Sequence, residues 1–339
     1  MVRLKDIALR AGVSVMTVSK VLRDAPDISA ATKSRIRRLS EEMGYMPDCV
    51  AQGLRTRTTK LLGLVISSIT NPIFARIVLG IEEQANELGY DILLVHTLNR
   101  TEREETCIRR LLSRRVDGLF LSPVYRMNPT SHIYQELHRC GTPTIVLGHR
   151  APFCNQFVSV ETDDLAASYA ATQHLLSLGH KRIAFFTGLV AAPWAQERYD
   201  GYRRALREAG LEVDERLIFQ AGETIEDGAK AALQMLEESP EATAIQAAND
   251  LIAMGAANIL LGQGLRIPED ISIVGFGNIM SSQFFRVPLT TIRQPKYRLG
   301  HAAMDSMLRL LRGEHPDIKR LPADLVVRSS TGPARNPGT

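Results

Sequence analysis

Cysteine is scarce in this sequence, and its spacing fits neither a metal site nor a disulfide framework. The 339 residues contain four cysteines, Cys49, Cys107, Cys140 and Cys154. They lie far apart and lack the short paired spacing of zinc ligands. We therefore expect free thiols in a reducing cytoplasm and no bound metal.

Long apolar runs are absent as well. No stretch is apolar for long enough to cross a bilayer, so we expect no membrane span. The first residues contain no apolar segment typical of a secretory signal, which favours a cytoplasmic location.

Patterns typical of enzymes are also missing. A partial glycine-rich turn at Gly275 and Gly277 has Met280 where a dinucleotide-binding fingerprint needs its third glycine, and no phosphate loop or nucleophile elbow occurs. The neighbouring carboxylates Asp163 and Asp164 fit the start of a helix better than a catalytic pair. The sequence therefore predicts a protein that is not an enzyme and has no cofactor.

Positive charge is concentrated at one end of the chain. Residues 1–60 hold 12 lysines and arginines against six acidic residues, a net charge of +6, and the remainder holds 29 against 31, a net charge of −2. This asymmetry indicates a polyanionic partner for the N-terminal segment, although a solvated basic surface would look the same.

Two short amphipathic segments open the chain. Residues 4–11 and 15–22 carry apolar side chains at helical spacing, with Gly12 placed for a sharp turn and Ser14 placed to cap the second helix. This is the pattern of a helix-turn-helix unit, and an ordinary helical hairpin is the alternative. The outward side of the second helix would present Val15, Met16, Thr17, Ser19 and Lys20 to a DNA major groove.

A third helix is predicted over residues 29–45, capped by Ser29 or Thr32 and ended by Gly44. After it, Asp48 is placed to cap one short helix that contains Val50 to Arg55.

From Lys60 onward, short apolar strands alternate with helices. Asn71 and Pro72 mark one helix start, and Thr101 with Glu104 has the spacing of a capping box. Such alternation predicts doubly wound parallel sheets, and two successive sets predict two lobes. Ligands of such folds bind outside the carboxyl ends of the strands.

The segments DIALRAGVSVMTVSKVL, GYMP and VAQGLR resemble the headpiece and hinge of the lactose-repressor (LacI/GalR) family of bacterial transcription regulators, and LTTIRQP resembles one of its crossovers between lobes. The resemblance implies an all-α helix-turn-helix headpiece on an α/β core like that of periplasmic binding proteins. Its implied parts are a headpiece (1–46), a hinge helix and linker (47–59), a core N-subdomain (60–161 with 294–324) and a core C-subdomain (162–293 with 325–339).

The resemblance also implies a function. The chain would be a homodimeric regulator, most simply a repressor, that binds a near-palindromic double-stranded DNA operator under the control of a small molecule. A solute-binding protein and a constitutive DNA-binding protein with a vestigial pocket are the alternatives. The C-terminal segment has no heptad repeat, which argues against a tetramerising coiled coil.

The family's DNA contacts map onto matching positions of this sequence. Base contacts fall on Val15, Met16 and Lys20, phosphate contacts on Thr17, Ser19 and Tyr45, and Ser14 caps the reading helix. In the hinge, Leu54 would insert into the minor groove, Ala51 would allow close approach, and Arg55 would reach the backbone.

The family's effector site lies between the lobes, and the ligand here would be polar and carbohydrate-like. Arg198 and Asn249 would anchor it, and the single tryptophan, Trp194, would stack on it or pack in the core. The full expected set is Ser67, Asn71, Phe74, His149, Trp194, Arg198, Glu223, Asn249, Asp250, Asn278 and Gln294. Gly277 stands where many relatives have an aspartate, so a nucleobase or a sugar acid stays open as the ligand.

Overall fold

A computed structural model describes residues 2–46 and 58–335 of the chain. These residues divide into two compact units, Met1–Thr59 and Lys60–Thr339, which are described separately.

Within residues 2–46, the N-terminal unit forms the helices α1 (Leu4–Ala11), α2 (Val15–Leu22) and α3 (Ala30–Glu42). Gly12 adopts a left-handed φ of 67° after α1, and the Ser14 side chain accepts a hydrogen bond from the Thr17 amide at 3.0 Å. Both roles confirm the predicted turn and cap. Ser29 caps α3. The small core of this unit consists of Ile7, Ala8, Ala11, Val18, Val21 and Ile36.

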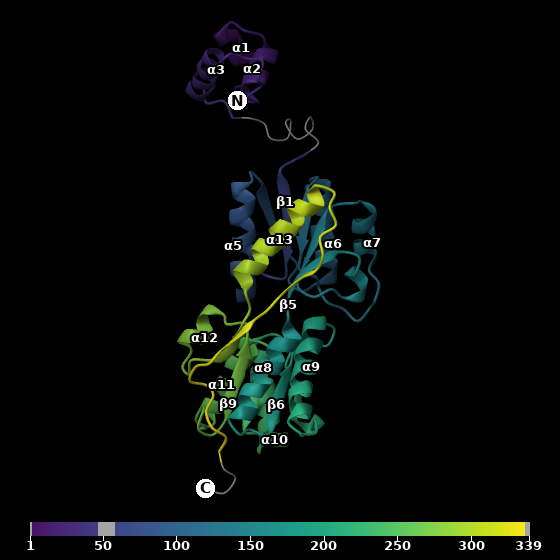
Figure 1. Cartoon of the computed structure of the whole chain (residues 1–339), viewed down its shortest axis with the longest axis vertical. Helices are drawn as coiled ribbons and strands as arrows, with labels where there is room; N and C mark the ends of the chain where they lie inside the picture. The colour runs from purple at the N-terminus through teal and green to yellow at the C-terminus, as the bar shows by residue number, and fades with distance from the viewer. Residues whose placement is uncertain (1, 47–57, 336–339) are drawn as a thin grey trace. The chain divides into compact units, whose positions relative to one another are not determined.

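The first lobe of the second unit is built on a parallel sheet with the strand order β11-β5-β4-β3-β1-β2. Its strands are β1 (Leu61–Ile66), β2 (Asp91–His96), β3 (Gly118–Leu121), β4 (Thr144–Leu147), β5 (Val158–Thr162) and β11 (Lys319–Leu321). Figure 1 shows helices on both faces of this sheet, namely α5 (Pro72–Glu87), α6 (Thr101–Ser113), α7 (His132–Arg139) and α13 (Lys296–Leu311). A 3-10 turn, η1 (Pro152–Cys154), precedes β5. Because both faces are covered, β1 and β3 are almost wholly apolar and buried.

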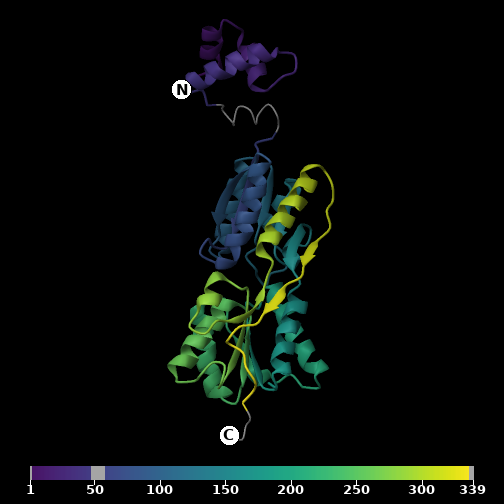
Figure 2. The same ribbon diagram turned by 60° about the vertical axis from the view of Figure 1, so that its left-hand side comes forward.

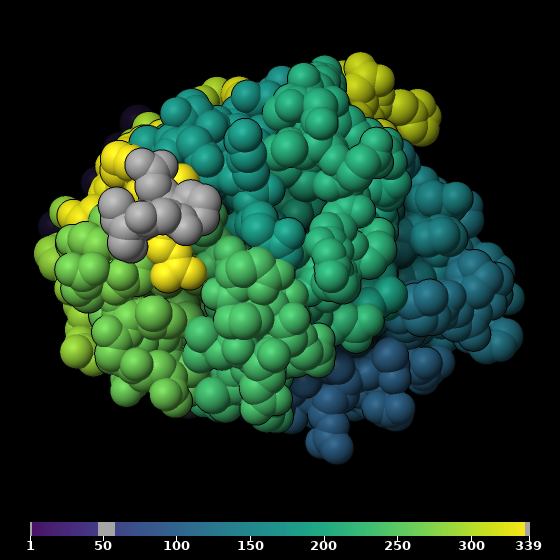
Figure 3. Space-filling view, turned by 90° about the horizontal axis from the view of Figure 1, so that it is seen from below, coloured from purple at the N-terminus to yellow at the C-terminus, as the bar shows by residue number. Residues whose placement is uncertain are grey.

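The second lobe repeats this plan with the order β12-β10-β9-β8-β6-β7, in which only β12 runs antiparallel to its neighbour. Its strands are β6 (Ile183–Thr187), β7 (Ile218–Gln220), β8 (Ala244–Ala247), β9 (Ser272–Phe276), β10 (Thr290–Arg293) and β12 (Asp324–Val326). Its helices are α8 (Asp164–Ser177), α9 (Pro193–Glu208), α10 (Ile225–Glu238), α11 (Asp250–Gly262) and α12 (Met280–Phe284), with a 3-10 turn η2 (Glu215–Leu217). Figure 3 shows the C-terminal segment, in yellow, against the end of this lobe, where the Ala334 amide donates to Leu178 O.

Three segments connect the lobes, from β5 to α8, from β10 to α13 and from β11 to β12. The second of them returns the chain to the first lobe, where α13 lies beside α5 (Figure 2). The two helices approach closely because each has a glycine at the crossing: a Cβ added at Gly80 would lie 2.6 Å from Tyr297 O, and one at Gly300 would overlap Ile77 O. The predicted α/β class with two doubly wound lobes is confirmed.

The predicted capping box at Thr101 and Glu104 is wrong. Arg100 is the N-cap residue of α6, and the Thr101 hydroxyl turns to Glu102. The Glu104 side chain is fully buried and accepts hydrogen bonds from Val124 N and from the Tyr134 hydroxyl, each at 2.7 Å. It also forms an ion pair with Arg126. Glu104 therefore fixes the loop after β3 instead of capping its own helix.

Candidate DNA-binding surface and ligand cleft

The exposed face of α2 presents the side chains that the sequence assigned to base contacts. Val15 is 46% exposed and Met16 is 63% exposed, although both are apolar. Thr17 and Ser19 are half-buried beside them, and Ser14 Oγ lies 2.9 Å from Thr17 Oγ1. Exposed apolar side chains at a helix N-terminus suit contacts with thymine methyl groups.

Lys20, the third assigned base contact, has a partner within the same unit. Its ammonium group forms an ion pair with Asp27, in the loop between α2 and α3, and this hydrogen bond lowers the pKa of Asp27. Tyr45, assigned to a phosphate contact, is half-buried against the core of this unit. The hinge positions Ala51, Leu54 and Arg55 lie outside the described residues.

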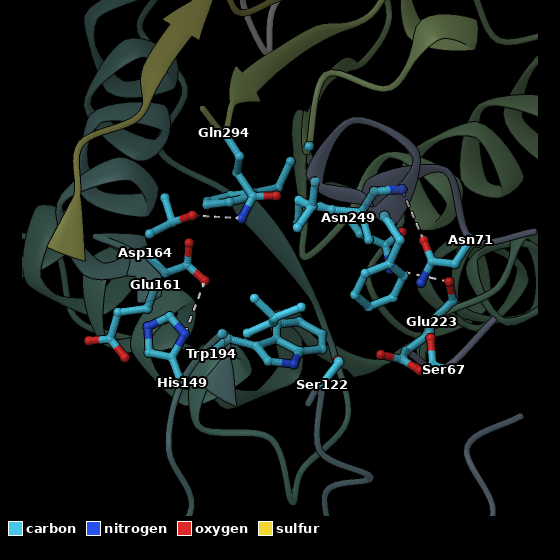
Figure 4. A pocket seen from close by; sticks show the side chains of 18 of the residues that line it. Ser67, Asn71, Ser122, His149, Glu161, Asp164, Trp194, Glu223, Asn249 and Gln294 are labelled. Atoms are coloured by element: carbon cyan, nitrogen blue, oxygen red, sulfur yellow. Dashed lines mark hydrogen bonds and ion pairs between the residues drawn. The ribbon is translucent and has the colours of Figure 1, made fainter. Parts of the chain in front are cut away.

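A cavity of about 380 Å³ lies between the two lobes of the second unit. It is lined where parallel strands end: Ser67 follows β1, Ser122 follows β3, Asn249 follows β8 and Gln294 follows β10. Ten of the eleven expected effector residues line it, namely Ser67, Asn71, Phe74, His149, Trp194, Arg198, Glu223, Asn249, Asp250 and Gln294. In Figure 4, His149 and Asp164 lie on one side of this cleft, Asn71, Glu223 and Asn249 lie on the other, and Trp194 lies between them.

Arg198 is buried in the cleft wall, and three hydrogen bonds hold its guanidinium group to the protein. Its Nε and Nη2 atoms donate to Asp164 Oδ2 at 3.2 and 2.9 Å, and Nη1 donates to Ala248 O. The guanidinium also lies 3.6 Å from the ring centre of Phe276 and 4.5 Å from that of Trp194. Burial raises the pKa of Asp164, and the positive charge of Arg198 opposes that rise. Arg198 thus organises the cleft wall, and each of its three nitrogen atoms donates to a protein acceptor.

Polar contacts cross the cleft at two places. On one side His149 of the first lobe lies 3.1 Å from Glu197 Oε2 of α9, and Arg320 of β11 pairs with the same carboxylate. Burial lowers the pKa of His149, but Glu197 and Asp164 outweigh it, so the pKa is raised overall. On the other side Asn99 Nδ2 donates to Glu223 Oε2 at 3.0 Å. Burial raises the pKa of the Glu223 carboxyl group. These contacts link the lobes directly.

Two of the expected cleft residues mainly hold the protein together. Asn249 caps α11 by accepting from Ile252 N at 2.8 Å. The buried Asp250 carboxylate instead accepts from Ile279 N, Ser282 Oγ and Thr291 Oγ1, and it shapes the floor of the cleft.

The expected effector contact of Asn278 has no support in the geometry. Asn278 is not among the residues that line the cavity, and its Oδ1 accepts from Arg328 Nη2 at 2.6 Å. Its φ of 48° turns the chain after Gly277, which lines the cleft in its place.

Several polar lining residues were not predicted, namely Asn99, Ser122, Tyr125, Glu161, Thr162 and Asp164. Ser122 and Thr162 stand at the ends of β3 and β5, so the strand-end rule would have found them. The sequence indicates only a helix start at Asp164, because its ion pair with Arg198, 34 positions away, leaves no local pattern.

Within residues 2–46 and 58–335, no three His, Cys, Asp or Glu side chains are grouped so that they could hold a metal ion. Among the same residues, no helix has the length and apolar character needed to cross a membrane.

Two parts of the chain match known protein families. Residues 3–48 match the family described as bacterial regulatory proteins, lacI family, and residues 59–329 match the periplasmic binding proteins and sugar binding domain of the LacI family. The chain is 33% identical over 330 residues to the HTH-type transcriptional repressor CytR of Escherichia coli (strain K12), covering 97% of this chain and 96% of that protein. It is 32% identical over 327 residues to the repressor PurR of Vibrio atlanticus (strain LGP32), covering 94% of this chain and 97% of that protein.

Solved structures agree with these relatives. The lac repressor dimer bound to operator and the anti-inducer ONPF matches with a TM-score of 0.87 and 30% identity, covering 98% of this chain and 99% of that chain. The complex of the transcriptional regulator CelR with cellobiose matches with a TM-score of 0.74 and 30% identity, covering 97% of this chain and 100% of that chain. With a helix-turn-helix unit, a two-lobed core and relatives along nearly its whole length, the chain belongs to the LacI family of bacterial transcription regulators.

Proposed function

We propose that this protein is a cytoplasmic transcriptional repressor that binds a near-palindromic operator as a homodimer and changes its DNA affinity when a small molecule occupies the cleft. The observation that carries the proposal is the presence, in one chain, of an exposed reading helix and a cleft whose walls come from two lobes. The lac repressor relative was solved as a dimer on its operator, which supports the same assembly here.

In the headpiece, Val15, Met16 and Lys20 read base edges, and Thr17, Ser19 and Tyr45 contact phosphates. Ser14 supports these contacts by fixing the first turn of α2. In the hinge, Leu54 forms a minor-groove wedge, with Ala51 and Arg55 beside it. Half-sites then lie about one helical turn apart, roughly 34 Å.

In the core, a ligand alters the balance of contacts that cross the cleft, which are His149 with Glu197 and Asn99 with Glu223. A ligand that favours one arrangement of the lobes shifts their equilibrium, and coupling of this kind is worth about 1–3 kcal/mol in DNA affinity.

The test is operator binding by the full chain, measured by fluorescence anisotropy on a duplex selected from random sequence and on an unselected duplex. We expect Lys20→Ala to weaken binding to the selected duplex by about 1–3 kcal/mol and to relax the preference at one base pair. Lys181→Ala, which removes an exposed lysine of the second lobe, is the matched control and leaves both affinities unchanged.

An equal loss on both duplexes would make Lys20 a phosphate contact. A protein that binds no duplex selectively would contradict the proposed function. Selective binding that no small molecule alters would favour a constitutive DNA-binding protein with a vestigial cleft.

A further inference from the structure

Two buried acceptor atoms in the cleft have no partner within the described part of the chain, Asp164 Oδ1 and Gln294 Oε1. Asp164 is 1% exposed and Gln294 is 8% exposed, and both line the cavity. The other end of each side chain is fixed, because Asp164 Oδ2 accepts from Arg198 and Gln294 Nε2 donates to Thr162 Oγ1 at 3.1 Å. Figure 4 shows Gln294 and Asp164 as neighbours on one side of the cleft.

Such atoms indicate what the cleft accepts. A buried acceptor without a donor costs free energy, and a ligand that supplies the donor recovers it. Both atoms are oxygens that only accept while Asp164 is ionised, so the matching ligand groups are hydroxyl or N–H donors.

A carboxylate without an ion pair stands on the opposite side of the cleft. Glu223 lines the cavity, and its side chain accepts a hydrogen bond from the neutral amide of Asn99. Within the described residues, no lysine or arginine forms an ion pair with Glu223, because Arg198 pairs with Asp164 and Arg320 pairs with Glu197. This side of the cleft is therefore also an acceptor.

The positive groups nearby are already engaged. Arg198 donates to Asp164 and to Ala248 O, and His149 faces Glu197 and Asp164. Lys296 donates to the backbone carbonyls of Gly277 and Asn278. Four carboxylates line the cavity: Glu161, Asp164, Glu223 and Asp250. An anionic ligand would meet these carboxylates, and the side chains within residues 58–335 that line the cavity and can carry positive charge, Arg198 and His149, already face carboxylates of the protein.

Apolar side chains complete the walls between the two polar ends. Phe74, Trp194, Phe276 and Leu299 line the cavity, and the Trp194 ring lies between the labelled polar groups in Figure 4. Such a wall suits the flat or apolar face of a ring, as aromatic side chains provide large apolar surfaces of fixed orientation.

We propose that the effector is a compact ring molecule without an anionic group, which donates hydrogen bonds from hydroxyl or N–H groups to Asp164 Oδ1 and Gln294 Oε1 at one end of the cleft and to Glu223 at the other. This inference rests on the proposed function and narrows its ligand: sugar acids, sugar phosphates and nucleotides are excluded, and neutral or amino sugars and nucleosides are admitted.

The test compares matched pairs of ligands on the full chain by isothermal titration calorimetry. Glucose is paired with glucuronate, adenosine with adenosine 5′-monophosphate, and glucosamine is added as a cationic ring. We expect a neutral or cationic member to bind at least tenfold more tightly than the corresponding anion. In Glu223→Gln, which keeps the shape and removes the charge, this ratio falls at least threefold. Glu226→Gln, which alters an exposed carboxylate of α10, leaves it unchanged.

An anion that binds as tightly as its neutral partner overturns the proposal, and so does an unchanged ratio in Glu223→Gln or a panel in which no member binds. Operator binding by the same preparation separates these failures from a failure of the proposed function. A chain that binds operator selectively but prefers anions has the function with a different effector, whereas a chain without selective DNA binding loses the function itself.

Discussion

Replacing Arg198 with methionine tests whether the cleft depends on its buried ion pair. The Arg198→Met side chain keeps most of the volume between Phe276 and Trp194 but leaves Asp164, 1% exposed, without its cation. Removing one member of a buried pair costs about 3–5 kcal/mol because the remaining charge stays buried. With an m value of about 3 kcal/mol/M, this loss moves the urea midpoint of the core by about 1–2 M.

The pH dependence of this loss identifies its cause. The pKa of Asp164 is raised by burial even with Arg198 present, and it rises further without the cation. A carboxyl group whose folded-state pKa is raised binds its proton more tightly in the folded state, so its contribution to stability is greatest below its unfolded pKa and is lost as pH rises through the folded pKa. The difference in free energy of unfolding between wild type and Arg198→Met should therefore shrink as pH falls from 7.5 towards 4.5.

A double variant serves as the control. Arg198→Met with Asp164→Asn removes both charges, and we expect it to recover much of the stability at pH 7.5. Asp163→Ala removes the cap of α8 and one partner of Arg320 but leaves the buried pair intact, and we expect it to cost about 1 kcal/mol. A loss below 1 kcal/mol in Arg198→Met, or one that is the same at both pH values, would refute the role assigned to the pair.

Three further predictions concern other parts of the chain. Glu104→Gln should lower the free energy of unfolding of the core by about 3–5 kcal/mol in urea denaturation, because Arg126 loses its buried partner; a loss under 1 kcal/mol would contradict the anchoring role of Glu104. Asp27→Asn should raise operator affinity on the order of twofold to fivefold by releasing Lys20, whereas Asp24→Asn, which removes the same charge beside Lys33 and Arg37, should raise it less; equal gains in anisotropy titrations would show a general charge effect. The His149 pKa is raised in the folded state, so the stability that protonated His149 contributes is present below pH 6.5 and is lost as pH rises through the folded-state pKa. His149→Gln should remove this loss of stability with rising pH. His174→Gln should change the slope of stability against pH in the opposite direction, because burial lowers the His174 pKa. Urea midpoints measured between about pH 5 and 8 would show whether the two slopes differ in sign, because the His174 effect falls below pH 6.5 and the His149 effect above it.

Local signals in the sequence were sufficient to predict the helices and strands and many of the residues that line the cleft. Gly12, Ser14, Asn71 and Pro72 act within a few residues of their own positions, so their roles follow from backbone geometry and capping. The strand-end rule likewise predicts Ser67 at the cavity, because parallel strands bring their carboxyl ends to one edge, whereas Gln294 follows from the resemblance of LTTIRQP to a family crossover.

Local signals could not predict contacts between residues that lie far apart in the sequence. Glu104 and Asp164 both look like residues of a first helical turn, and only the packed structure shows that each is buried against an arginine. Arg198 matched the family's position, but its donors proved to be directed to Asp164 and Ala248. The strands β11 and β12 are three residues each, too short for a periodic pattern.

The discontinuity of the first lobe has a consequence for synthesis on the ribosome. Helix α13 and strand β11 complete this lobe, yet they follow the whole second lobe in the chain, and the contact between Tyr297 and Glu83 joins residues 214 positions apart. While the second lobe is being translated, the α5 face around Gly80 and the outer edge of β5 have no covering element of their own. Contacts of such long range form slowly, and uncovered apolar faces and strand edges promote aggregation. The second lobe, whose chain is continuous except for β12 and the C-terminal segment, is therefore expected to fold before the first. We also expect substitutions at the Gly80–Gly300 crossing to lower the yield of folded protein more than the stability of the folded protein suggests.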